Sequence, residues 1–321
     1  MMPPPYNLRP NKAVDRLTLI EAIKRVVPAD ELRQYTYYGM GGPYLEDFRL
    51  VYELYPEIKM VCIEKNEDIH KRQKFHLPCR SRRLRLEKTP LSSFLAEYDP
   101  DGERSIFWLD YTDLKFANFD DFMDLLGKVG EKSIIKITLR CNPPDYQSPI
   151  PEKQLEREEE FKRRFDAVLP GSFQTVPIKR RDFAILIQEM LQIASQKALP
   201  GTTPRMFLPI SSFFYSDGTG IFTLTGVVCP RIDEANFRKL FKTWDFANLN
   251  WNVPLEINVP NLSTKERLHL QRRLPCHKNA GRILRRSLGY MIDKNRARTE
   301  TQLQQYADFH RYFPYFVRAT P

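Results

Sequence analysis

A glycine-rich turn and the carboxylate of Glu64 are the parts of this sequence whose residue types and spacing best suit chemistry. The turn contains Gly39, Gly41 and Gly42, and Glu64 ends the next apolar run, Lys-Met-Val-Cys-Ile-Glu. Glycine adopts positive φ without steric cost and lets a ligand lie against bare backbone. A carboxylate that ends a second strand accepts hydrogen bonds from two ribose hydroxyls. Together these residues predict a binding site for a nucleoside cofactor.

The glycine spacing distinguishes between cofactors. A dinucleotide fingerprint has a third glycine three residues after the second, which lets the helix pack close to the strand around a pyrophosphate. Tyr44 occupies that position here. A cofactor without phosphates, such as S-adenosylmethionine, does not need the third glycine, so we favour it over a nicotinamide or a flavin. A glycine turn that binds nothing is the remaining alternative.

Strand-like and helix-like segments alternate around this turn. Such spacing predicts right-handed crossovers and a parallel sheet, and therefore a Rossmann-like, doubly wound α/β fold. A capping box at Thr18–Glu21 marks an opening helix that ends before Pro28. The predicted strands are 34–39, 59–64, 83–87, 105–110 and 133–141, and helices are expected at 44–55 and from Glu67, Leu91 and Asp120.

The pattern changes after the fifth strand. Prolines and a charged helical stretch at 152–164 predict an insertion over 143–181, which we interpret as a lid. A helix over 182–197 resumes the fold. Two long apolar runs, 206–216 and 220–228, flank Asp-Gly-Thr-Gly and predict an antiparallel hairpin that ends the sheet.

This arrangement resembles the class I S-adenosylmethionine-dependent methyltransferases over residues 34–230. More narrowly, it is similar to a bacterial family of putative O-methyltransferases. The narrower resemblance rests on Tyr-Gly-Met-Gly-Gly-Pro-Tyr-Leu-Glu-Asp-Phe at 38–48, Ile-Glu at 63–64, Trp-Leu-Asp-Tyr at 108–111, Phe-Leu-Pro at 207–209 and Tyr-Ser-Asp-Gly at 215–218. It implies an S-adenosylmethionine site at Gly39, Gly41, Gly42 and Glu64. The chain departs from many such enzymes in lacking an acidic residue near the start of the first strand, where Tyr35–Tyr38 stand.

The resemblance also places Asp110 and Tyr111 beside the methyl donor, at the carboxyl end of the fourth strand. We predict that both are catalytic, with Asp110 as general base or substrate orienter, because an attacking hydroxyl must lose its proton. A turn-forming aspartate is the alternative for Asp110. Tyr111 and Asp113 follow on the same loop and have a weaker claim, because the polarity of a surface loop explains them equally well. Asn-Pro-Pro-Asp at 142–145 approximates the signature of amino-methylating nucleic-acid enzymes, but a proline-forced strand exit explains it better.

Composition limits the remaining classes. The net charge of +10 indicates an acidic partner such as nucleic acid. The N-terminus lacks a signal sequence and no apolar run is long enough to span a membrane, so we expect a cytoplasmic protein. The five histidines and five cysteines have neither metal-ligand nor disulfide spacing, so no metal site is predicted; the cysteines are Cys62, Cys79, Cys141, Cys229 and Cys276.

Basic residues concentrate near the C-terminus. A capping box at Ser263–Glu266 and a second helix from Ala280 outline two short helices, the second with Arg282, Arg285 and Arg286 on one face. We predict that these arginines bind nucleic acid or another polyanion; a solvated basic face and a protein-partner site are the alternatives. The expected divisions are an N-terminal helical segment (1–33), the methyltransferase domain (34–230) and a basic, mainly helical region (231–321).

The sequence thus predicts an S-adenosylmethionine-dependent methyltransferase of unidentified acceptor, with nucleic acid among the acceptors considered. The alternative is a nucleic-acid-binding or antiviral defence-associated interaction protein that has this fold with weak or no catalysis. Acceptor pockets would be built from the insertion and the terminal helices, which contain no readable motif.

Overall fold

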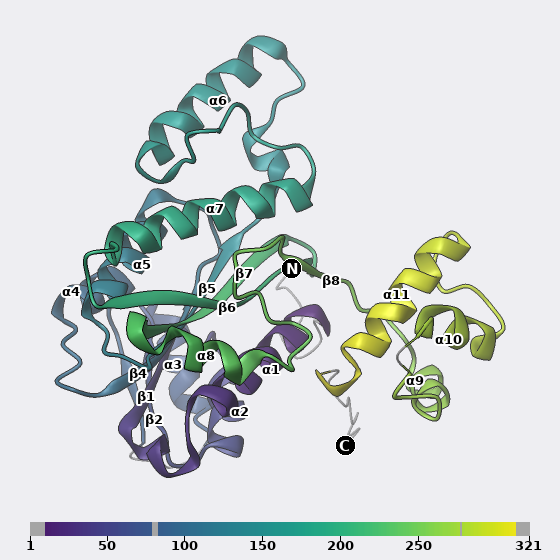
Figure 1. Cartoon of the computed structure of the whole chain (residues 1–321), viewed down its shortest axis with the longest axis horizontal. Coiled ribbons are helices and arrows are strands. Elements are labelled where there is room, and N and C mark those ends of the chain that lie inside the picture. Colours follow the sequence, from purple (N-terminus) through teal and green to yellow (C-terminus); the bar gives the residue numbers. More distant parts are fainter. Residues whose placement is uncertain (1–9, 79–82, 277, 313–321) are drawn as a thin grey trace. The chain divides into compact units, whose positions relative to one another are not determined.

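A single mixed sheet organises the chain (Figure 1). The computed structural model describes residues 10–78, 83–276 and 278–312, so Cys79 and His277 lie outside the described residues. The strand order is β3-β2-β1-β4-β5-β7-β6-β8. The strands are β1 (Tyr35–Gly39), β2 (Lys59–Ile63), β3 (Leu84–Glu87), β4 (Arg104–Asp110), β5 (Ile134–Arg140), β6 (Arg205–Ser216), β7 (Gly220–Pro230) and β8 (Leu255–Ile257).

The first five strands are parallel, and β7 runs antiparallel to β5. This arrangement confirms the predicted parallel sheet that ends in an antiparallel hairpin. Successive residues of β1 face opposite sides, as the two-residue period of a strand requires. Tyr37 contacts Phe48 edge-on with ring centroids 5.1 Å apart, whereas Tyr38 stacks on Phe107 at 4.3 Å. Both faces of the sheet are therefore buried, as in a doubly wound fold.

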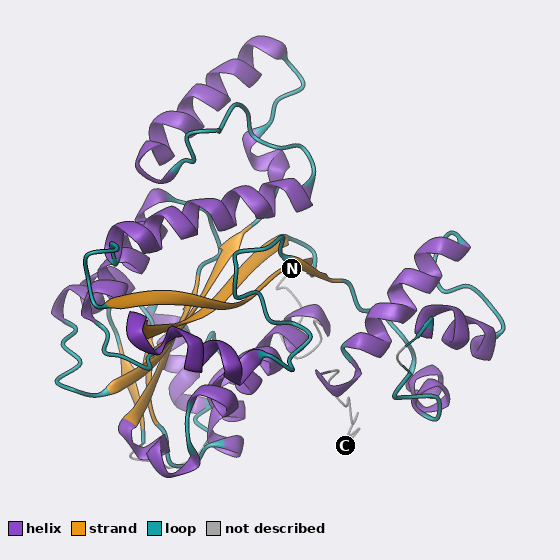
Figure 2. Cartoon of the chain, viewed as in Figure 1, coloured by secondary structure: helices purple, strands orange, loops and turns teal. Residues whose placement is uncertain are grey.

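Helices cover both faces of the sheet (Figure 2). The core on the Tyr38 face includes residues of α4, α5 and α7. The helices are α1 (Pro10–Val26), α2 (Glu46–Leu54), α3 (Glu67–Phe75), α4 (Leu91–Glu97), α5 (Phe116–Lys128), α6 (Pro151–Phe165), α7 (Arg180–Ala198), α8 (Glu234–Phe241), α9 (Thr264–Gln271), α10 (Ala280–Leu288) and α11 (Arg296–Asp308).

Two predicted helix starts are wrong. Thr18 lies in the middle of α1, where its hydroxyl donates to the carbonyl of Asp15 at 2.7 Å and caps no terminus. The helix α5 begins at Phe116, four positions before the predicted Asp120, because Asn118 accepts a hydrogen bond from the backbone amide of Lys115 at 2.6 Å. The capping box at Ser263 is confirmed.

The chain divides into two compact units. The larger comprises Leu19–Phe214 and Thr219–Leu255, which include strands β1 to β5 with their helices. The smaller comprises Tyr215–Gly218, the described residues up to Thr18, and those from Glu256 onward, which include α9 to α11. Among the residues that the structure describes, no helix has the length and apolarity needed to cross a membrane.

Candidate functional site

The carboxyl ends of the parallel strands bring the predicted site residues to one edge of the sheet. Gly39 pairs with Cys62 of β2 and with Trp108 of β4, and Asp110 pairs with Thr138 of β5. Strands β2 and β3 extend from β1 in one direction, whereas β4 and β5 extend in the other. This reversal is the switch point at which open α/β sheets bind ligands. Gly39, Glu64 and Asp110 therefore lie along a common edge.

Gly41 and Gly42 have the positive φ that the turn was predicted to need, whereas Gly39 does not. Gly41 has φ +43° and Gly42 has φ +52°, which glycine adopts readily. A Cβ added to Gly41 would lie 2.7 Å from Phe48, 2.8 Å from Leu45 and 2.9 Å from the sulfur of Cys62. Gly41 therefore makes room for side chains of the chain itself, and not only for a ligand.

Two hydrogen bonds join the last turn of α3 to the glycine turn. Gln73 Nε2 donates to the carbonyl oxygen of Gly42 at 3.0 Å. Arg72 donates to the hydroxyl of Tyr44 at 2.8 Å, and its guanidinium carbon lies 4.9 Å from the centroid of the tyrosine ring. Tyr44, which occupies the position of the missing third glycine, thus packs against α3. No sequence pattern indicates these roles of Arg72 and Gln73, because the contacts form only in the fold.

Glu64 follows β2 and keeps its carboxylate close to the backbone. Its Oε1 accepts a hydrogen bond from the amide of Asn66 at 2.7 Å. The helix cap of α3 is supplied by Asn66, whose Oδ1 accepts from the amide of Ile69 at 3.0 Å. A carboxylate that ends a strand could also cap the next helix, but here Asn66 has that role. This leaves Glu64 suited to accept hydrogen bonds from a ligand.

Two polar atoms on α3 are buried without a hydrogen-bond partner among the described residues. They are Nδ1 of His70 and Oε1 of Gln73. Burial lowers the pKa of His70, with a further contribution from the nearby Lys74. The imidazole is therefore biased toward its neutral form, in which one ring nitrogen accepts a hydrogen bond. Both orphaned atoms belong to the helix that supports the glycine turn.

Tyr111 and Asp113, which follow Asp110, are engaged within the protein. The hydroxyl of Tyr111 donates to Asp121 on α5 at 2.7 Å, and Asp113 forms an ion pair with Lys115 at 2.6 Å. Burial, reinforced by the charge of Asp121, raises the pKa of Tyr111 well above its ordinary value. The phenol is thus a poor general base, and a catalytic role for Tyr111 stays a prediction. Asp110 is half-buried at the end of β4.

The Asn-Pro-Pro-Asp segment closes on itself. Asn142 donates to Asp145 Oδ1 at 2.7 Å, and Arg140 binds both carboxylate oxygens of Asp145. Burial raises the pKa of Asp145, but the hydrogen bond and charge of Arg140 outweigh it and hold that pKa below its usual value. Pro143 begins a short 3-10 helix, Pro143–Tyr146. These contacts favour the proline-forced strand exit over an amino-methylating site.

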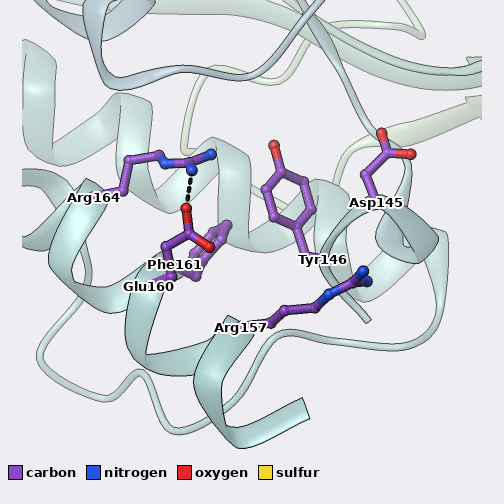
Figure 3. A pocket seen from close by; sticks show the side chains of 6 residues that line it. All are labelled: Asp145, Tyr146, Arg157, Glu160, Phe161 and Arg164. Carbon is purple, nitrogen blue, oxygen red and sulfur yellow. Dashed lines mark hydrogen bonds and ion pairs between the residues drawn. The ribbon is translucent and has the colours of Figure 1, made fainter. Parts of the chain in front are cut away.

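Residues of the insertion, which follows β5, line two cavities. One encloses about 230 Å³ and another, which reaches the first turn of α7, about 490 Å³. Figure 3 shows the smaller cavity, where the ion pair between Arg164 and Glu160 lies beside the ring of Tyr146. Its lining residues carry both charge signs; they are Asp145, Tyr146, Arg157, Glu160, Phe161 and Arg164.

Metal and thiol chemistry find no support in the part of the chain that the structure describes. No group of three or more histidine, cysteine, aspartate or glutamate side chains there is arranged to hold a metal ion. Cys62, Cys141 and Cys229 are buried free thiols. Burial raises the pKa of Cys141 and of Cys229 to about 12, so these thiols remain protonated and unreactive.

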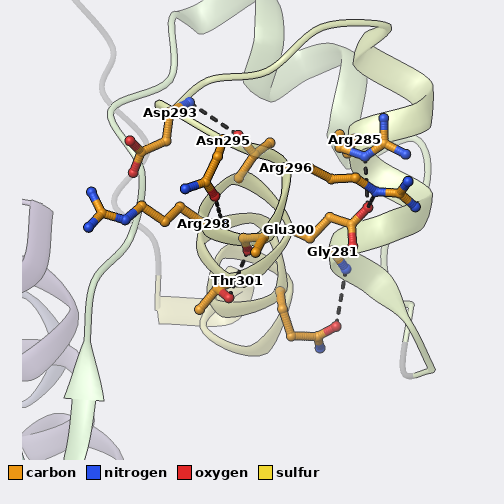
Figure 4. A network of polar contacts seen from close by, with 11 residues as sticks. Gly281, Arg285, Asp293, Asn295, Arg296, Arg298, Glu300 and Thr301 are labelled. Atoms are coloured by element: carbon orange, nitrogen blue, oxygen red, sulfur yellow. Dashed lines mark hydrogen bonds and ion pairs between the residues drawn. The ribbon is translucent and has the colours of Figure 1, made fainter.

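The three predicted nucleic-acid-binding arginines of α10 differ in their surroundings. Arg285 forms an ion pair of 2.8 Å with Glu300 of α11, which also pairs with Arg296 at 2.9 Å (Figure 4). Arg282 and Arg286 are exposed and form no hydrogen bond or ion pair with any described residue. The structure thus divides the set into one internally paired arginine and two that face solvent.

A family model described as "Putative O-methyltransferase" matches residues 4–321 of the chain. No protein of curated function matches the sequence. Among solved structures, Trm1 from Pyrococcus horikoshii with S-adenosyl-L-methionine has 11% identity and a TM-score of 0.46, covering 68% of this chain and 55% of that chain. Human N-acetylserotonin methyltransferase with S-adenosylmethionine has 12% identity and a TM-score of 0.32, covering 67% and 56%.

A DUF574 family protein from Streptomyces avermitilis has 10% identity and a TM-score of 0.39, covering 68% of this chain and 82% of that chain. The chain spans little more than half the length of Trm1 and of the human enzyme, 55% and 56% respectively. At such identities the likeness concerns the fold alone.

Proposed function

The chain belongs to the family of putative O-methyltransferases, and from this premise we propose that it binds S-adenosylmethionine and transfers the methyl group to an acceptor hydroxyl. The observation that supports the proposal best is the environment of Glu64. Its carboxylate stands at the switch-point edge beside the glycine turn, and Asn66, not Glu64, caps α3. A carboxylate placed there and free of a capping role suits the hydroxyls of a ribose.

The described residues fit such a cofactor. Gly39, Gly41 and Gly42 form the turn against which it would lie, and Glu64 would hold its ribose. When bound, S-adenosylmethionine supplies a methyl group on a positively charged sulfur, which a nucleophile can attack. Nδ1 of His70 and Oε1 of Gln73, both on α3, have unused hydrogen-bonding capacity.

The chain's own contribution to the reaction is to orient the acceptor and to take up its proton. Asp110 lies at the end of β4, next to β1 on the opposite side from Glu64. We assign it the role of accepting the acceptor's hydroxyl proton. Tyr111 has a positioning role instead, because its hydroxyl is already donated to Asp121.

The direct test is retention of labelled S-adenosylmethionine by the purified full-length chain. The proposal expects saturable retention that is competed by S-adenosylhomocysteine. Labelled methyl groups should then appear in an acceptor pool of hydroxyl-bearing small molecules or of nucleic acid. Absence of saturable retention would contradict the proposal and favour the non-catalytic alternative.

Nucleic-acid binding is a second candidate function, and the exposed arginines of α10 favour it. Arg282 and Arg286 lack any partner among the described residues, and other basic side chains of the same unit are exposed; these are Lys265, Arg272, Arg273, Lys278, Lys294, Arg296 and Arg298. Such a surface suits a phosphate backbone. It would serve a methyltransferase that acts on nucleic acid, or a defence-associated interaction protein with weak or no catalysis.

A further inference from the structure

Arg180 is a cation without a counter-charge at the edge where the acceptor must lie. It is the first residue of α7, and its Nε atom is buried without a hydrogen-bond partner. No described residue forms an ion pair or hydrogen bond with its guanidinium group. Because burial of an unpartnered polar group costs free energy, an arginine held in this way indicates a missing partner.

The backbone around Arg180 is shaped to accommodate the side chain. A Cβ added to Gly220, the first residue of β7, would lie 2.9 Å from Arg180 Nε. The neighbouring Cys141 donates its amide to the carbonyl of Gly220 at 2.8 Å, and its thiol lies 3.7 Å from the carbonyl of Arg180. Arg180 is therefore held over the bare backbone where β5 ends and β7 begins.

The acidic side chains in the segments that follow β4 and β5 already have basic partners. Asp145 is paired with Arg140, and Asp113 with Lys115. Asp182, exposed in the first turn of α7, lines the cavity of about 490 Å³ with residues of the insertion, a cavity that Arg180 does not line. The N-terminus of α7 also lacks a side-chain cap, and its free amides add to the positive potential around Arg180.

The position along the sheet identifies which substrate Arg180 would meet. The order of the strand ends runs from Glu64 on β2, past Gly39 on β1 and Asp110 on β4, to β5 and then β7. The cofactor lies on the β1 and β2 side in our proposal. The acceptor must then lie beyond Asp110, on the side of β5 and β7 where Arg180 stands.

We propose that Arg180 recognises the acceptor, and that the acceptor carries an oxyanion group, a carboxylate or a phosphate, in addition to the hydroxyl that is methylated. This inference rests on the proposed function for the identity of the acceptor side. Arginine binds both oxyanions through paired, charge-assisted hydrogen bonds. Arg180 is thus a specificity-determining residue that orients the acceptor toward Asp110.

The test measures binding of fluorinated probes to the full-length chain by fluorine NMR, with and without S-adenosylhomocysteine, at constant ionic strength. The probes are 4-fluorobenzoate, 4-fluorophenyl phosphate and the uncharged 4-fluorobenzyl alcohol. At least one anion should bind more tightly than the alcohol, and the tighter of the two identifies the oxyanion. Arg180→Gln should lower the affinity for that anion by roughly tenfold to a hundredfold, and Arg180→Lys should lower it by less.

Arg181→Gln is the matched control. Arg181 is the next residue of α7 and is exposed, and its substitution removes the same charge as Arg180→Gln. It should leave anion affinity unchanged. Equal anion affinity in the wild type and Arg180→Gln, an equal loss in Arg181→Gln, or no preference for either anion would overturn the inference. If S-adenosylmethionine is not retained while the Arg180-dependent anion binding persists, the proposed function fails and the anion site stands.

Discussion

The hydroxyl of Tyr111 donates a 2.7 Å hydrogen bond to Asp121 Oδ2, so the loop after β4 is fixed to α5. Burial raises the pKa of Asp121, and the hydrogen bond from Tyr111 lowers it. The same contact raises the pKa of Tyr111 beyond the effect of burial. The pair thus fixes the loop that begins at Asp110 by a hydrogen bond whose strength depends on the charge of Asp121.

Tyr111→Phe should lower the free energy of unfolding by about 1–3 kcal/mol near neutral pH, because it leaves the Asp121 carboxylate without its donor. The pKa of Asp121 in the folded chain is above the ordinary value of 3.8. The neutral form of Asp121 therefore contributes to the free energy of unfolding, and this contribution is lost as the pH rises through the pKa of the folded state. Urea unfolding at about pH 4 and about pH 7 should show a smaller effect of Tyr111→Phe in acid. An identical effect in an Asp121→Asn background would argue against the coupling.

Gly281→Ala should destabilise the helical C-terminal unit. A Cβ at Gly281 would lie 1.9 Å from the backbone oxygen of Glu300, so α10 and α11 must separate to accept it. Gly127→Ala in α5 is the opposite case, because its Cβ would meet nothing within 4 Å. We expect a gain of roughly 0.4–1 kcal/mol there from the reduced entropy of the unfolded chain. Thermal unfolding of both variants should show a lower stability for Gly281→Ala and a higher stability for Gly127→Ala. A stabilised Gly281→Ala would contradict the close contact between α10 and α11.

Asp110→Asn should separate cofactor binding from chemistry. The variant keeps the shape of the side chain but loses most of its basicity, so affinity for S-adenosylmethionine should be retained while methyl transfer falls by roughly a hundredfold or more. Calorimetry gives the affinity, and label transfer to the identified acceptor gives the rate. Full transfer activity in Asp110→Asn would reduce Asp110 to a turn residue.

The exposed arginines of α10 should govern the salt dependence of nucleic-acid binding. Replacing Arg282 and Arg286 by alanine should flatten the log–log slope on duplex DNA by up to about 1.8, since each phosphate contact contributes about 0.9. Arg285→Ala is the control, because Arg285 is paired with Glu300 and should change the slope little. Fluorescence anisotropy at several salt concentrations measures the slopes. If the wild type does not bind nucleic acid at low salt, the basic face of α10 is either a solvated face or a site for a protein partner.

Elements with strong periodicity could be predicted from the sequence, whereas some helix starts could not. The parallel strands and the hairpin follow from apolar runs separated by turns, and the structure confirms them. The same capping pattern is correct at Ser263 and wrong at Thr18, because a Thr hydroxyl inside a helix bonds to a preceding carbonyl just as well. The helices α8 and α11 and the strand β8 were not predicted, since their apolar patterns are short or weak.

Only those residues of the candidate site that lie at the carboxyl ends of strands could be predicted from the sequence. Gly39, Glu64 and Asp110 occupy positions that the order of strands fixes. Arg180 was not predicted, because its missing counter-charge is a property of its surroundings and not of its residue type. The packing role of Gly41 was hidden for the same reason, since Phe48 and Leu45 reach it only in the fold.

The most direct test of the account is the affinity of S-adenosylmethionine for the wild type and for Glu64→Gln, measured by isothermal titration calorimetry. Glu64→Gln is preferable to Gly41→Val, whose side chain would collide with the Cys62 sulfur and its neighbours and would disturb folding. Asn66→Ala serves as a control that removes the cap of α3 without removing the carboxylate. We predict saturable binding by the wild type, a roughly tenfold to hundredfold loss in Glu64→Gln, and little change in Asn66→Ala. Equal affinity in a folded Glu64→Gln, or no binding by the wild type, would contradict the cofactor site on which the account depends.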